Sequence, residues 1–83
     1  METMIVEICV PAISKTFDFQ LPSGGIVHDM IAEIVRVLLE TQRGLSFDDR
    51  YPMLCHVTDG RILNENDTLA GAGVYDGVSL MLL

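Results

Sequence analysis

Two histidines and two cysteines are the side chains best suited to nucleophilic or acid-base chemistry in this chain of 83 residues. His28 and His56 are far apart in the sequence, and the sequence pattern positions no Ser or Cys as a paired nucleophile. A side-chain nucleophile needs a base within hydrogen-bond reach. We therefore expect structural or surface roles for both imidazoles, and no enzymatic activity.

The same side chains also lack the spacing of a metal site. Cys9 and Cys55 are too few and too far apart for a zinc site or a disulfide framework, which show closely spaced cysteines. The carboxylates of residues 48–49 and 65–67 have no companion ligands and are typical of a solvated surface. We expect two inert thiols, one of them in the core, and neither a metal nor a cofactor.

A glycine-rich segment runs from Gly71 to Gly77 and superficially matches a nucleotide-binding motif. Its third glycine comes one position late, and no strand-to-helix turn surrounds it. The segment is instead typical of a turn in which glycines adopt positive φ.

The charge of the chain indicates its class of partner. The 12 acidic and 5 basic residues give a net charge of −7, which argues against binding to nucleic acid or anionic lipid. Glu2 and Glu7 interrupt the N-terminal apolar stretch, so we expect neither a signal peptide nor direct membrane insertion. A cytoplasmic protein with a protein partner fits best.

Hydrophobic periodicity predicts the elements that would position these residues. Residues 4–10 and 16–21 alternate with period two around a proline-containing turn, which indicates a β-hairpin. Apolar residues spaced as in a helix follow over 26–41, with Gly44 as a cap. We expect residues 45–52 to form an ordered connection between this helix and the next strand.

Three further strands are predicted over residues 53–58, 61–63 and 78–83, with a hairpin turn at Asp59-Gly60. One helix on one face of a mixed sheet of about five strands is an α+β fold, and we expect residues 1–83 to form a single domain. The inward-facing residues predict this core: Met4, Val6, Ile8, Phe17, Phe19, Ile31, Ile34, Leu38, Leu69, Val74 and Leu80.

This order of elements, together with the C-terminal segment, resembles the ubiquitin β-grasp family. The stretch from Gly60 to Leu69, Asp76-Gly77 before the last strand and the end at Leu83 are most similar to the small YukD-like proteins of Gram-positive type VII (ESX-type) secretion systems. The resemblance implies a cytosolic accessory or regulatory protein that binds a cytoplasmic domain of a membrane secretion component. A ubiquitin-like interaction domain of another pathway is the alternative.

The C-terminal residues bear on a third class, the conjugated modifiers and sulfur carriers. Those proteins use a free Gly-Gly tail, whereas this sequence ends Leu80-Met81-Leu82-Leu83. We therefore expect no conjugation through the C-terminus.

The sheet face away from the helix is the expected binding surface. If Met53, Cys55 and Val57 face the helix, then Leu54 and His56 point to the open side. The same alternation exposes Met81 on the last strand and Ile5 on the first. The predicted partner-binding residues are Ile5, Leu54, His56, Met81 and Leu83.

Overall fold

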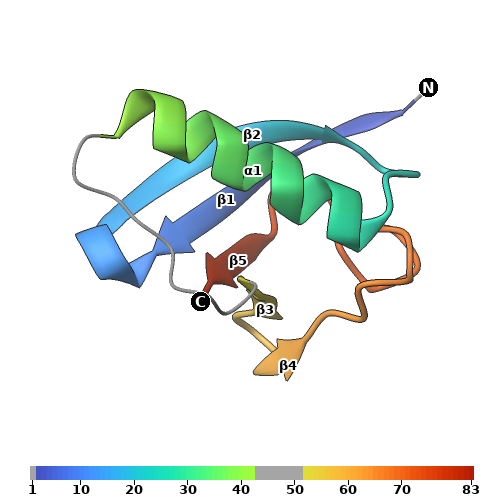
Figure 1. Cartoon of the computed structure of the whole chain (residues 1–83). Helices are drawn as coiled ribbons and strands as arrows, with labels where there is room; N and C mark the ends of the chain where they lie inside the picture. The colour runs from blue at the N-terminus through green and yellow to red at the C-terminus, as the bar shows by residue number, and fades with distance from the viewer. Residues whose placement is uncertain (1, 43–51) are drawn as a thin grey trace.

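The fold is a sheet with a helix across one of its faces (Figure 1). The computed structural model describes residues 2–42 and 52–83. Within these ranges the elements are β1 (Thr3–Val10), a 3-10 turn (Pro11–Ile13), β2 (Lys15–Pro22), α1 (Val27–Thr41), β3 (Leu54–His56), β4 (Arg61–Ile62) and β5 (Ser79–Leu82). This confirms the predicted α+β fold and its order of elements. The predicted cap at Gly44 and most of the predicted connection over 45–52 lie outside the described residues.

The strands of the described sheet lie in the order β2-β1-β5-β3-β4. β1 and β5 are parallel neighbours, with Ile8 in register with Leu80. The other pairs, β1 with β2, β3 with β5 and β3 with β4, are antiparallel. The sheet is therefore mixed, and β5, which comes from the C-terminal part of the chain, lies at its centre beside β1.

The hairpin of β1 and β2 follows from the alternation in its sequence. Residues 4, 6, 8 and 10 of β1 are buried, while most residues between them are exposed. Ser14 turns the chain in the left-handed region at φ 52°, and its N–H donates to the carbonyl of Pro11 at 3.1 Å. This turn sets the register that brings Met4 beside Leu21.

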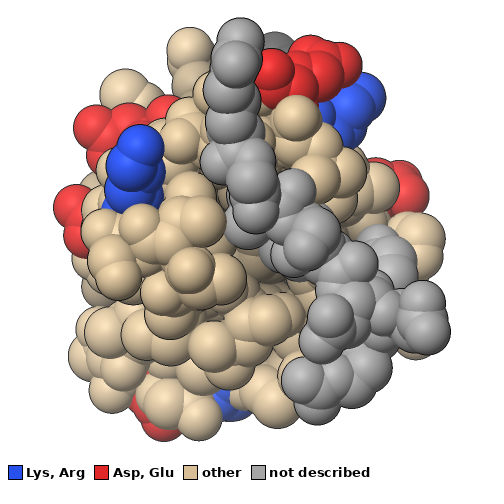
Figure 2. All heavy atoms as spheres, turned by 60° about the vertical axis from the view of Figure 1, so that its left-hand side comes forward, with Lys and Arg blue, Asp and Glu red and all other residues tan. Residues whose placement is uncertain are grey.

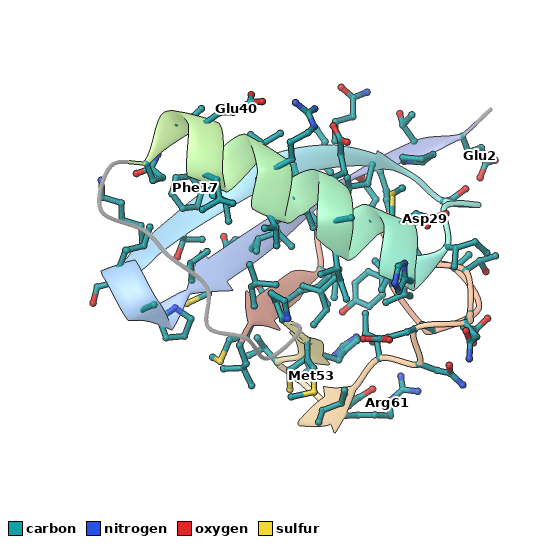
Figure 3. The ribbon with its side chains drawn as sticks, in the orientation of Figure 1. Glu2, Phe17, Asp29, Glu40, Met53 and Arg61 are labelled. Atoms are coloured by element: carbon teal, nitrogen blue, oxygen red, sulfur yellow. The ribbon has the colours of Figure 1, made fainter. Side chains whose placement is uncertain are left out.

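α1 buries one apolar stripe against the sheet. Its buried residues are Val27, Ile31, Ile34 and Leu38. Charged side chains such as that of Glu40 project from its outer side, away from the sheet (Figure 3). The helix is thus amphipathic as predicted, and it leaves the opposite sheet face uncovered.

The start of α1 is held by backbone groups of the loop after β4. The N–H of Val27 donates to the carbonyl of Asp67 at 2.8 Å, and the N–H of His28 donates to Glu65 at 3.0 Å. A hydrogen bond of 2.9 Å from Leu69 N–H to Gly25 carbonyl joins the same segments. Carbonyl groups of this loop therefore accept the hydrogen bonds of helix amides that, in many other helices, donate to a capping side chain.

The core lies between α1 and the sheet. All of the predicted core residues are buried except Phe17 and Phe19, which are partly buried and pack against the others. Figure 3 shows Phe17 beneath the C-terminal half of α1. The core also contains buried residues that the prediction did not include: Val10, Leu21, Val27, Leu54, Leu63, Ala72, Val78 and Leu82.

The glycine-rich segment forms turns, as predicted. Gly73 and Gly77 have φ values of +88° and +87°, which glycine adopts without steric cost. Arg61 reaches this segment and donates through Nη2 to the carbonyl of Ala72 at 3.1 Å. The turns place Val78 in the core and lead directly into β5.

Candidate partner-binding face

The sheet face opposite α1, here called the open face, is the candidate site. Side chains alternate across a strand, so the residues in register with exposed β1 positions share this face. Its members within the strands are Thr3, Ile5, Glu7 and Cys9 of β1, Thr16, Asp18, Gln20 and Pro22 of β2, Cys55 of β3, Ile62 of β4, and Ser79 and Met81 of β5.

A row of apolar and sulfur-containing side chains crosses this face. The register places Cys9 beside Met81, Met81 beside Cys55 and Cys55 beside Ile62. Adjacent strands are about 4.8 Å apart, so the two cysteines lie about 10 Å from each other, too far for an intramolecular disulfide. Ile62 is exposed, and the other three side chains are half-buried.

Met53 and Leu83 extend this row at one end of β3 and β5. Each donates its N–H to the carbonyl of the other, at 3.0 Å and 2.9 Å, and both side chains are exposed. Alternation along the two strands puts these side chains on the same side as Cys55 and Met81. We call the combined surface the apolar patch, made of Cys9, Met53, Cys55, Ile62, Met81 and Leu83.

The prediction for the facing of β3 was wrong. Leu54 and His56 are 0% and 3% exposed and belong to the core, whereas Met53 and Val57 are 39% and 47% exposed. Leu54 is in register with Leu82, and His56 with Leu80, both on the buried side of β5. The alternation was identified correctly, but the inward and outward sets are exchanged.

The error has a physical cause in the composition of the two sets. Met53, Cys55 and Val57 are together more apolar than Leu54, His56 and Thr58, so hydrophobicity favours burying the first set. The fold buries the second set because β3 pairs with β5 in a register that places Leu54 and His56 beside buried residues, and the N–H of Asp59 donates to the imidazole of His56. A one-residue shift in such an assignment moves every side chain to the other face.

Three of the five predicted partner-binding residues lie on the open side of the sheet. Met81 and Leu83 belong to the apolar patch, whereas Ile5 lies four residues before Cys9 on β1, about 13 Å along the strand. The structure therefore does not bring Ile5 together with the others. The predicted binding residues did not include Cys9, Met53, Cys55 or Ile62. For Met53 and Cys55, the register of β3 with β5 was the missing information.

His56 and Cys55 contact neighbouring backbone groups, and the expectation of one thiol in the core is wrong, because both cysteines are half-buried. Nδ1 of His56 accepts a hydrogen bond from the N–H of Asp59 at 3.4 Å, and its ring centroid lies 6.2 Å from that of Tyr75. The thiol of Cys55 makes a long contact of 3.9 Å with the carbonyl of His56. Among residues 2–42 and 52–83, no three His, Cys, Asp or Glu side chains are grouped to hold a metal ion.

The outer side of α1 carries a cluster of charged side chains, in contrast to the apolar patch. Arg36 donates to Glu33 and, at 3.1 Å, to Glu40. The hydrogen bond from Arg36 holds the pKa of Glu33 below its ordinary value, and Glu33 in turn raises the pKa of Arg36. Elsewhere acidic side chains predominate, and Figure 2 shows Lys and Arg only as small separate groups on the surface in view.

A helix on a mixed sheet whose parallel β1 and β5 are central neighbours defines the class of ubiquitin-like β-grasp proteins. Solved structures agree on this class. The chain is similar to the EccD5 ubiquitin-like domain from Mycobacterium xenopi, with a TM-score of 0.82, 28% identity, and coverage of 100% of this chain and 94% of that chain.

A family model described as the YukD protein of the WXG100 protein secretion system (Wss) matches residues 3–82, and the chain belongs to this family. A search of curated protein sequences finds no match. No helix in the described parts of the chain is long and apolar enough to cross a membrane.

Two further structures share the fold at lower identity. The ubiquitin-like domain of the Mycobacterium tuberculosis type VII secretion protein EccD1 has a TM-score of 0.69 and 24% identity, and the match covers 100% of this chain and 99% of that domain. A chain of the ESX-5 inner membrane complex has a TM-score of 0.80 and 24% identity, and the match covers 100% of this chain but 21% of that chain.

The fold by itself does not identify a function. A chain of the toluene 4-monooxygenase HD complex has a TM-score of 0.81 with 6% identity. Similar backbones therefore occur in proteins of unrelated activity, and the function must be argued from the surface.

Proposed function

We propose that this chain is a non-catalytic binding component of a type VII secretion system. It acts in the cytoplasm and docks through its open face onto a cytoplasmic domain of a membrane component. The observation that carries the proposal is the apolar patch on the sheet face that α1 leaves uncovered. Membership of the YukD family and the similarity to EccD ubiquitin-like domains support the assignment to this machinery.

The composition of the apolar patch suits protein binding. Ile62, Met53 and Leu83 are large and exposed, and they share the open face with half-buried Met81. A contiguous apolar surface with a polar rim is typical of an interaction site, and methionine adapts its shape to a partner.

A matched pair of substitutions tests the proposed docking face. Ile62 on the open face and Leu39 on α1 are large apolar residues with similar exposure, 55% and 50%. We expect Ile62→Asp to abolish recovery of a secretion-system membrane component from the native host, because a buried interface anchor contributes about 2 kcal/mol or more. Leu39→Asp should leave the recovery unchanged. The measurement is affinity capture with mass-spectrometric identification, and thermal unfolding checks that both variants fold.

Two results would contradict the proposal. If both variants recover the component equally, the open face is not the docking surface. If neither variant nor the unaltered chain recovers any component of the secretion machinery, the chain acts in another pathway, as a ubiquitin-like interaction domain.

We also propose that the chain is a binding module that is not itself covalently attached to other proteins. We expect the protein recovered from its host under denaturing conditions to give a single intact mass. A series of heavier adducts linked through the C-terminus would show that it is a conjugated modifier.

A further inference from the structure

Two carboxylates lie directly opposite each other on the open face. Glu7 of β1 is in register with Asp18 of β2, and both side chains are exposed. Like charges in such a cross-strand position destabilise a sheet, because their Cβ atoms are only about 5 Å apart. Ser79 donates to Glu7 Oε1 at 3.2 Å, but this hydroxyl brings no positive charge.

The described basic side chains do not compensate this acidic pair. Lys15 is in register with buried Val10, and its Nζ reaches Gln42 at the end of α1. Arg36 lies on α1. Arg61 is in register with buried His56 and bonds to the carbonyl of Ala72. Within residues 2–42 and 52–83, the open face therefore carries carboxylates and no Lys or Arg.

The acidic pair adjoins the apolar patch. Glu7 is two residues before Cys9 on β1, a separation of about 7 Å along the strand, and Asp18 is one strand further out. A single partner segment can therefore contact both surfaces. A helix rises 1.5 Å per residue, so the separation of about 7 Å between Glu7 and Cys9 corresponds to about five residues of that segment.

We propose that the segment that docks on the open face is basic and amphipathic, with apolar side chains on the apolar patch and Arg or Lys beside Glu7 and Asp18. This inference rests on the proposed function and specifies the chemistry of its partner. Complementary charge would relieve the repulsion between the two carboxylates and favour partners of this composition. A second copy of the chain fits less well, because it carries the same acidic pair and a net charge of −7.

The test uses two synthetic helix-forming peptides of about 18 residues with the same leucines on one face. One peptide carries arginines beside the leucines, and the other carries glutamates at the same positions. We expect the arginine peptide to bind about tenfold more tightly at low ionic strength, with the ratio falling in salt. Isothermal titration calorimetry gives the two dissociation constants.

Native Cys9 and Cys55 report where the peptide binds, because both thiols belong to the apolar patch. At a peptide concentration about four times its Kd, one fifth of the protein stays free, so alkylation of both thiols should slow about fivefold. Glu7→Gln with Asp18→Asn should remove the preference for arginine. Glu33→Gln with Glu40→Gln removes the same charge from α1 and should keep that preference.

The remaining outcomes would overturn the inference. Equal binding of both peptides, or binding that leaves the thiols unprotected, means that the acidic pair does not select the partner. If neither peptide binds, the inference is also wrong. It is likewise wrong if the protein self-associates as its concentration rises and this association protects the thiols without peptide. None of these results depends on which host protein is captured, so the proposed function is tested separately by Ile62→Asp.

Discussion

His56 is a polar side chain within an apolar core, and its neighbours explain how the core accepts it. The turn after β3 directs the N–H of Asp59 toward Nδ1, and the ring packs near Tyr75. Buried polar groups in native proteins are hydrogen-bonded, since an unpaired group costs about 1–3 kcal/mol. His56 thus joins the turn at 57–60 to the core.

We expect His56→Ala to lower the free energy of unfolding by about 2 kcal/mol, because it leaves a cavity in the core and removes the hydrogen bond to the N–H of Asp59. Val57→Ala is the control; this side chain points outward, so the change should cost about 0.5 kcal/mol or less. Urea denaturation measures both values. A larger loss for Val57→Ala would contradict the facing of β3 described above.

At the scale of elements, α1 depends on two different kinds of contact. Its N-terminal amides bond to carbonyls of residues 65 and 67, and its outer side carries the charged group of Glu33, Arg36 and Glu40. The first contact fixes where the helix begins. The ion pairs of Arg36 are exposed to solvent and add little stability, but they lower the pKa of Glu33.

We expect Arg36→Met to raise the pKa of Glu33 toward its ordinary value, because the hydrogen bond from Arg36 is the main cause of its lowered pKa. A carboxyl whose pKa is lowered by folding stabilises the protein above its unfolded-state pKa, and that contribution is lost as pH falls through the folded-state pKa. Arg36→Met should therefore weaken the pH dependence of stability in acid.

NMR titration of the Glu33 side-chain carboxyl measures this pKa. Lys15→Met is the control, because it removes the same charge from a side chain that bonds to Gln42 instead. An unchanged pKa of Glu33 in Arg36→Met would show that the ion pair does not persist in solution.

At the scale of the whole molecule, the sequence predicted the elements better than the site. The alternation of β1 and β2 and the stripe of α1 each have one clearly apolar set, so their burial follows from hydrophobicity. In β3 the more apolar set faces outward, because the choice depends on β5 and on the turn that pairs with His56. Those contacts are tertiary, and periodicity carries no information about them.

The pairing of β1 with β5 has a consequence for how the chain acquires its fold. Glu7 and Ser79 are 72 residues apart, yet they are neighbours in the centre of the sheet. Closing so long a loop is entropically costly, and contacts between distant residues slow folding. β3 and β4 can join the hairpin of β1 and β2 in one sheet only through β5, the last of these strands to be synthesised. The sheet is therefore completed only after β5 has left the ribosome.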